Sequence, residues 1–454
     1  MTGVDVADSV VYGHLWSTPE TRDLFDDRGR TRAWLQIIAA LAAVQGELGI
    51  IPADAAEEIA GAGDLELDLD AVGEETRRSG HSMLGLIRVL QRRLRADGAE
   101  WVHHGATVQD VSDTWTALVM QRMLAIARRD LGTIERSLLA LADEHRDTLM
   151  LGRTHGQPGL PITFGFKAAV WAAETGRHLE RIAAAEPRLA VGQLAGAVGT
   201  QSSWGDQGPE LQRRLMERLG LGAPDASWLT ARDRVAEFTA LLALVTGTLA
   251  KIGNEVYNLQ RAEIGELSET PAPGVVGSIT MPQKQNPERS EHLWTLARVV
   301  RASVGLALEG LVGEHERDGA AWKTEWAFLP RASTAAAAAL AGAADLLAGL
   351  RVDRDRMRAN LDAQQGHALA EPVMLALVPH TGRQRAHALV HRAASVGRRS
   401  NRPLLEALAS DPEVTAHLPP DALADLMRPE RSLGAVAAAI DDVLVRAQGR
   451  TAAP

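Results

Sequence analysis

The chain contains no cysteine among its 454 residues, which excludes disulfides, iron–sulfur ligation and a cysteine nucleophile. Phe, Trp and Tyr make up only 4% of the residues although 46% are hydrophobic, so aliphatic side chains must build the core. Lys and Arg (48) are outnumbered by Asp and Glu (58), and the net charge of −10 argues against general nucleic-acid binding. The length fits about three domain-sized units, or one long fold with end domains.

Lysine is scarce as well, because only Lys167, Lys251, Lys284 and Lys323 stand among the 48 basic residues. Long apolar runs are also missing, and none approaches the roughly 20 residues that a membrane span requires. The first ten residues lack the basic start and apolar stretch of a secretory signal. We therefore expect a cytoplasmic protein with no membrane partner.

Proline is absent from long intervals of the chain, such as those between Pro52 and Pro158 and between Pro224 and Pro271. Because proline breaks helix interiors, these Ala/Leu/Arg-rich intervals favour long helices. Apolar residues alternate four and three apart from Phe238 to Leu259, which predicts a helix with one continuous apolar seam. Strand signals are scarce, so the predicted fold is all-α, with a long central helical bundle.

The distribution of prolines and glycines predicts three successive domains. Residues 1–111 form a helical N-terminal domain, residues 112–350 a central long-helix bundle, and residues 351–454 a C-terminal helical domain of shorter helices. The segment from Thr270 to Pro287 interrupts the central domain and is rich in proline and glycine. Its composition alone fits either a flexible crossover or a functional loop.

Three segments resemble the signature segments of the aspartase/fumarase superfamily. In Gly277–Pro287 the residues Gly277, Ser278, Met281, Pro282, Lys284 and Asn286 match the family's loop, while Ile279 replaces its usual second serine. Gly152–Gln157 is similar to the family's Gly-Arg-Thr-His segment, and His104–Asp110 to its first substrate-contacting segment. Over nearly its whole length the chain resembles the branch of 3-carboxy-cis,cis-muconate cycloisomerases and adenylosuccinate lyases.

The resemblance implies a homotetramer whose central domains merge into one helical bundle, with each active site built from segments of three subunits. It also implies anti β-elimination from a small dicarboxylate substrate, without a metal or an organic cofactor. Such a reaction removes a proton next to a carboxylate, so the site must supply positive potential to the doubly charged intermediate.

By this resemblance Ser278 is the general base, and loop amides and nearby charge must stabilise its alkoxide. The alternative is a purely structural role, in which Ser278 is a turn residue that caps backbone amides. Lys284 and Asn286 would bind the carboxylate next to the removed proton, and a compact ammonium explains why arginine is not used there.

His155, next to Thr154, is the candidate general acid, since imidazole titrates near neutral pH. A substrate contact, or a helix-end histidine held by backbone, is its alternative. Thr107 and Gln109 would hold the second carboxylate. The pair His81 and Ser82 would line the pocket, although adenylosuccinate lyases carry an aspartate where Ser82 stands.

Several other features have a simpler structural explanation. His387 and His391 are four residues apart on a predicted helix, but no third metal ligand is evident. The glycines of Gly192–Gly199 follow no strand, so tight packing or a turn explains them better than a dinucleotide site. The segment with Arg317, Trp322 and Trp326 either borders the pocket or supplies aromatic packing; these three residues receive no assigned role.

The departures from the family patterns leave the substrate open. Gln283 and Gln285 flank the lysine where adenylosuccinate lyases favour His and Arg, and Pro158 stands where muconate cycloisomerases usually carry a histidine. We expect a C–N lyase that releases fumarate from a small succinate or aspartate derivative, such as nitrosuccinate. A muconate cycloisomerase and a non-catalytic structural member of the family are the alternatives.

Overall fold

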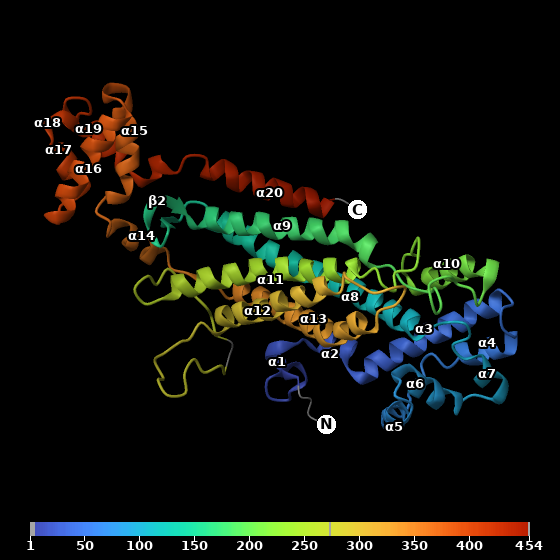
Figure 1. Cartoon of the computed structure of the whole chain (residues 1–454). Helices are drawn as coiled ribbons and strands as arrows, with labels where there is room; N and C mark the ends of the chain where they lie inside the picture. Colours follow the sequence, from blue (N-terminus) through green and yellow to red (C-terminus); the bar gives the residue numbers. More distant parts are fainter. Residues whose placement is uncertain (1–4, 272–273, 453–454) are drawn as a thin grey trace. The chain divides into compact units, whose positions relative to one another are not determined.

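The computed structural model describes residues 5–271 and 274–452, and most of these residues lie in helices (Figure 1). The all-α prediction is confirmed. The longest helices are α8 (Val108–Glu144), α9 (Phe164–Leu189), α11 (Asp233–Gln260), α12 (Glu288–Glu309) and α13 (Gly319–Ala348). The apolar seam predicted from Phe238 to Leu259 lies within α11, and both of these residues are buried.

Shorter helices precede, connect and follow the long ones. Before α8 come η1 (Val6–Asp8), α1 (Gly13–Trp16), α2 (Pro19–Phe25), α3 (Asp27–Glu47), α4 (Ala53–Ala60), α5 (Leu69–Ser79), α6 (Ser82–Gln91) and α7 (Ala96–Trp101). Between α9 and α11 lie η2 (Gly205–Gln207) and α10 (Gly208–Leu219). After α13 come α14 (Arg354–Asp362), η3 (His367–Leu369), α15 (Ala370–Thr381), α16 (Arg383–Arg399), α17 (Leu404–Ala409), α18 (Pro412–Thr415), α19 (Pro420–Leu426), η4 (Pro429–Ser432) and α20 (Val436–Ala452).

Local sequence signals set where several helices begin. Thr18 caps α2 through a reciprocal capping box with Thr21, and Pro19 occupies the first turn, where its missing N–H costs nothing. Asp26 caps α3 by accepting the Gly29 amide.

The strands are few and short. β1 (Leu149–Thr154) and β2 (Gln157–Thr163) form an antiparallel hairpin in which Leu149 lies opposite Thr163 and Thr154 opposite Gln157. β3 (Leu267–Ser268) pairs with β4 (Arg351–Val352). The hairpin escapes sequence reading because Pro158 and Pro161 lie inside β2, and proline weakens any strand signal.

The chain divides into two compact units that are each assembled from three stretches of sequence. Unit 1 comprises Met1–Asp130, His178–Ala250 and His292–Gly342, and unit 2 comprises Leu131–Arg177, Lys251–Glu291 and Ala343–Pro454. The five longest helices each contribute residues to both units. The two compact units are built from separate stretches of sequence and do not follow the order of the chain. The division into three successive domains stays a prediction.

Each unit has its own apolar core, which in unit 2 includes Val373, Leu377 and Leu389 of α15 and α16. In unit 1 a cluster that includes Leu41, Leu211 and Leu215 packs α3, α8 and α10 together. In unit 2, α9 and α11 are joined by two ion pairs, Lys167 Nζ to Glu255 Oε1 at 2.6 Å and Lys251 to Glu174. Among the described residues α11 is the one helix whose length and composition would suit a membrane span, yet 67% of its most apolar window is buried inside the protein. Such burial is typical of a core helix.

Candidate active site

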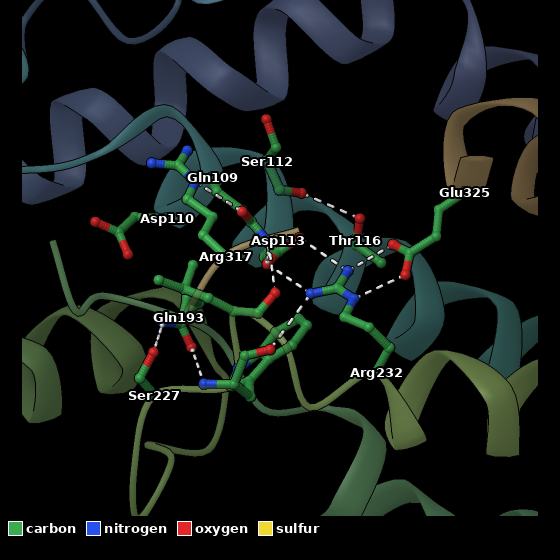
Figure 2. Close-up of polar contacts among 12 residues, drawn as sticks. Gln109, Asp110, Ser112, Asp113, Thr116, Gln193, Ser227, Arg232, Arg317 and Glu325 are labelled. Carbon is green, nitrogen blue, oxygen red and sulfur yellow. Dashed lines mark hydrogen bonds and ion pairs between the residues drawn. The ribbon is translucent and has the colours of Figure 1, made fainter. Parts of the chain in front are cut away.

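The first candidate cluster lies at the start of α8, in unit 1 (Figure 2). The Arg317 guanidinium donates from Nη1 to the Thr107 hydroxyl at 2.7 Å and from Nε to Gln109 Oε1 at 3.0 Å. Gln109 is completely buried, and its Nε2 donates to Asp113 Oδ2 at 3.1 Å and to the Leu229 carbonyl at 2.9 Å. Two of the predicted substrate contacts thus fix an exposed arginine in one orientation.

A carboxylate in the first turn of α8 holds the backbone of Thr107, while the Thr107 hydroxyl contacts Arg317. Thr107 immediately precedes α8, and its backbone N–H donates to Asp110 Oδ2 at 2.8 Å. Asp110 also accepts the amides of Ala195 and Gly196, at 2.8 and 3.0 Å. Burial raises the pKa of Asp110 to about 6, although the three backbone donors oppose that shift. The glycine-rich segment is therefore packed against the first turn of α8, as the simpler explanation predicted.

The turn before Thr107 requires special backbone geometry. Gly105 has a φ of 75°, and a Cβ atom there would lie 2.5 Å from the Trp204 ring nitrogen. His103 also has a positive φ, 63°, a region in which histidine is better tolerated than most residues. Burial of its ring lowers the pKa of His103 to about 4, so the imidazole is neutral at pH 7.

A buried ion cluster of Asp113, Arg232 and Glu325 contacts Gln109 through Asp113. Arg232 donates to both oxygens of Asp113, at 2.8 and 3.1 Å, and to both oxygens of Glu325, at 2.7 and 2.5 Å. All three side chains are almost fully buried. Burial raises the pKa of Glu325, whereas its hydrogen bonds with Arg232 oppose that shift. The two charged hydrogen bonds to each carboxylate fix Asp113, which in turn holds the Gln109 amide.

His81 and Ser82 lie at the start of α6. His81 is the N-cap residue of α6 and is exposed. Ser82 is the first residue of α6, and its side chain lies outside the described ones. Their role in lining a pocket stays a prediction.

The second candidate cluster belongs to unit 2 and begins with the β1–β2 hairpin. His155 and Gly156 form its two-residue turn, with φ values of 53° and 73°. Positive φ at both central residues is the geometry of a type I′ turn, which presents the turn side chains away from the ribbon. His155 is exposed at this tip and not at a helix end, and Thr154 precedes it at the last position of β1. A histidine held at positive φ is a strained feature of the kind that is common at functional sites.

The signature loop lies between α11 and α12, also in unit 2. The loop turns back on itself, so that Gly277 lies against the backbone of Lys284. A Cβ atom on Gly277 would lie 2.7 Å from the Lys284 carbonyl oxygen. The Ser278 hydroxyl oxygen accepts the Met281 amide at 3.1 Å. Lys284 is exposed, and Asn286 donates to Glu288 Oε1 at 3.2 Å. Ile279, which replaces the family's second serine, is 96% exposed.

Sequence reasoning left Arg317 without a role, although its hydrogen bonds make it central to the first cluster. No local pattern connects it to Gln109, because 208 residues separate them. The structure brings Thr107, Gln109 and Arg317 together in unit 1, and it places His155, Thr154, Ser278, Lys284 and Asn286 in unit 2. Among the described residues no group of three or more His, Asp or Glu could hold a metal ion.

A family model described as "Lyase" matches residues 16–302, and one described as "Adenylosuccinate lyase C-terminus" matches residues 366–443. N-acetyl-S-(2-succino)cysteine lyase of Dickeya dadantii is 39% identical over 97% of this chain and 97% of its own. Adenylosuccinate lyase of Methanothermobacter thermautotrophicus is 38% identical over 95% of this chain and 97% of its own. The crystal structure of 3-carboxy-cis,cis-muconate lactonizing enzyme from Pseudomonas putida superposes with a TM-score of 0.89 at 33% identity, covering 96% of this chain and 99% of that one.

Proposed function

Because the chain belongs to this lyase family, within the aspartase/fumarase superfamily, we propose that it releases fumarate from a small 2-substituted succinate by anti β-elimination. The observation that carries the proposal is the exposed Arg317 guanidinium, which Thr107 and Gln109 hold in place. A guanidinium whose orientation is fixed before binding is a suitable receptor for a substrate carboxylate. Gln109, being buried, then acts through Arg317 and does not touch the substrate.

Ser278 removes the proton from the carbon next to the second carboxylate in this scheme. The electron pair of that C–H bond forms the fumarate double bond, and the bond between the neighbouring carbon and the leaving heteroatom breaks. The Met281 amide, which already donates to the Ser278 oxygen, stabilises the alkoxide that acts as base. The ammonium of Lys284 and the amide of Asn286 offset the charge that builds up on the aci-carboxylate intermediate.

His155 is the proposed general acid, which protonates the leaving heteroatom. Its imidazole lies at an exposed hairpin tip, where it can approach a substrate bound by other segments. The site is completed, we propose, in a homotetramer whose subunits contribute different segments. The exposed apolar side chains of the signature loop, Val276, Ile279 and Met281, support this assembly, because they would be covered by a neighbouring subunit or by substrate.

The leaving group is bonded through sulfur in the favoured version of this proposal. Two relatives, each 39% identical over 97% of this chain, are named N-acetyl-S-(2-succino)cysteine lyases. A C–N lyase acting on a succinate or aspartate derivative is the second candidate, favoured by the adenylosuccinate lyase at 38% identity. The chemistry at Ser278 and Arg317 is the same for both, because only the leaving heteroatom differs.

A substrate panel tests these alternatives. Purified protein is incubated with N-acetyl-S-(2-succino)cysteine, adenylosuccinate, aspartate, nitrosuccinate and 3-carboxy-cis,cis-muconate, and fumarate is followed by its ultraviolet absorbance. Fumarate together with free thiol from the first compound supports the favoured version, and fumarate from a nitrogen compound supports the second. Consumption of the muconate with no fumarate from any compound would overturn both.

Subunit mixing tests the shared site. Ser278→Ala and His155→Ala proteins are each expected to be inactive, and mixing them should restore part of the activity, because some sites then receive both intact side chains. Exchange of subunits is verified with a mass tag on one variant. Verified exchange without any recovery would refute a site assembled from several subunits.

A further inference from the structure

A cavity of about 110 Å³ in unit 1 lies between α3, α8 and α13. Four of the chain's ten tryptophans line it: Trp34, Trp115, Trp322 and Trp326. Trp34 packs edge-on against Trp115, and Trp322 against Trp326. So many indoles around one hollow, in a chain that has few aromatic residues, indicate a site for an apolar or flat group.

Two hydrogen-bond donors at this cavity have no partner in the part of the chain that the structure describes. They are the indole Nε1 of Trp34 and the Nε of Arg30, and both atoms are buried. Buried donors are normally satisfied, and an indole N–H can only donate. A ligand that places an acceptor oxygen in the cavity would satisfy them.

The charges around the cavity limit which acceptor fits. The Arg30 guanidinium lies 5.1 Å from the centre of the Trp115 ring, so it presents positive charge. Glu325 also lines the cavity, but both of its oxygens are occupied by Arg232. An ammonium group would meet the like charge of Arg30, whereas a neutral carbonyl can accept from both donors. An ionised carboxylate would lose its hydration among the indole rings, so a neutral carbonyl with an apolar substituent fits best.

The cavity is close to the substrate-binding cluster proposed above. Ser112 lines it and lies three residues after Gln109 on α8, so the two share a face of the helix and are about 4.5 Å apart along its axis. Trp322 follows Arg317 by five residues. A succinate derivative held by Arg317 could thus extend its leaving group from one site into the other.

We infer that this cavity binds the acylated amine of the leaving group and makes the enzyme selective for N-acyl over free-amine substrates. The amide carbonyl accepts from Arg30 and Trp34, and the acyl methyl group packs against the indole rings. The cavity of about 110 Å³ has room for such a group. A water molecule, with one heavy atom, occupies about 30 Å³, and an acetamido group has four heavy atoms. This inference depends on the proposed function in one respect, namely that Arg317 binds the succinyl half of the substrate.

The selectivity is measured as the ratio of kcat/KM for N-acetyl-S-(2-succino)cysteine to that for S-(2-succino)cysteine. We expect a ratio of at least about 10, because the free ammonium faces Arg30. Trp34→Phe keeps an aromatic ring but removes the N–H, and it should lower the ratio about fivefold. Trp294→Phe is the control, since it makes the same change at an exposed indole that does not line the cavity, and it should leave the ratio within about twofold. Thermal melting of each variant checks that it is folded.

Equal kcat/KM for the two compounds, or equal effects of the two Phe variants, would overturn the inference. If neither compound yields fumarate, the proposed function fails, and the cavity is judged by binding alone. Isothermal titration with N-acetyl-L-cysteine and with L-cysteine then decides. Preferential binding of the acetylated compound that is weakened by Trp34→Phe supports the cavity assignment, and absence of that preference refutes it.

Discussion

Arg153 and Glu266 form a two-pronged ion pair, with Nη2 at 2.6 Å from Oε1 and Nη1 at 2.9 Å from Oε2. Glu266 is completely buried, and Asn360 also donates to its Oε1 at 2.8 Å. Arg153 lies two residues before His155, and Glu266 immediately precedes β3, in the segment that leads to Ser278. The pair therefore connects the hairpin of the proposed acid to the base of the signature loop, within unit 2.

Glu266→Gln should lower both stability and turnover. The substitution keeps the shape of the side chain but leaves Arg153 without its buried counter-charge, which typically costs about 3 kcal/mol. The melting temperature should fall by several degrees, and kcat should fall because the hairpin tip loses its fixed position.

Glu255→Gln is the matched control for that experiment. It removes the partly exposed partner of Lys167 in the same unit, where an ion pair contributes less than about 1 kcal/mol. Equal losses in the two variants would contradict a special role for the Arg153–Glu266 pair.

Thr107→Val should weaken substrate binding by removing the hydroxyl that holds Arg317. Valine has nearly the same shape, so the backbone contact to Asp110 is retained. Loss of one hydrogen bond to a charged group corresponds to about 1.5–3 kcal/mol, and kcat/KM should fall about tenfold or more. Thr107→Ser keeps the hydroxyl and should retain most of the activity. If steady-state kinetics gave the same loss for serine and valine, the hydroxyl would not be the cause.

Ser278→Ala should lower kcat by at least about a thousandfold, because a base that makes the C–H cleavage possible is removed. The melting temperature should hardly change, since Ser278 makes one hydrogen bond in a half-exposed loop. Thr280→Ala removes another hydroxyl from the same loop and should keep near-full activity. A Ser278→Ala protein that still turns over substrate at the original rate would refute the assignment of the base.

The fold was largely predictable from the sequence, whereas the supporting contacts of the site were not. Proline-free intervals and the Phe238–Leu259 seam indicate α11, because helix periodicity can be recognised within a short stretch of sequence. Arg232 and Glu325, by contrast, are 93 residues apart, and nothing near either residue identifies its partner. The same holds for Arg317 and Gln109, 208 residues apart, so the orientation of the arginine appears only in the fold.

The signature residues show a similar division. The motif locates Ser278, Lys284 and Asn286 in one loop, but it does not show that the Met281 amide donates to the serine oxygen. His155 was assigned from the resemblance of its segment to the family's Gly-Arg-Thr-His pattern, and its hairpin turn was hidden by the prolines of β2. The residues of a local motif can thus be predicted from the sequence, while the orientation of each side chain depends on tertiary contacts.

His103 should make folding stability depend on pH in the acidic range. Burial lowers its pKa to about 4, against about 6.5 in an unfolded chain. Between these values the unfolded chain binds a proton that the folded chain does not, so stability is complete above about pH 6.5 and declines as the pH falls toward 4. At about 1.4 kcal/mol per pKa unit, the loss is on the order of 3 kcal/mol.

His103→Asn isolates this contribution, because asparagine tolerates the positive φ at this position and does not titrate. Denaturant unfolding of both proteins at intervals from pH 7.5 to 4.5 measures the slopes. Other acidic and histidine groups affect the two proteins alike, so the difference between their stabilities should shift in favour of the variant as the pH falls through 6.5. A difference that stays constant over this range would show that His103 binds its proton equally well in the folded and unfolded chains.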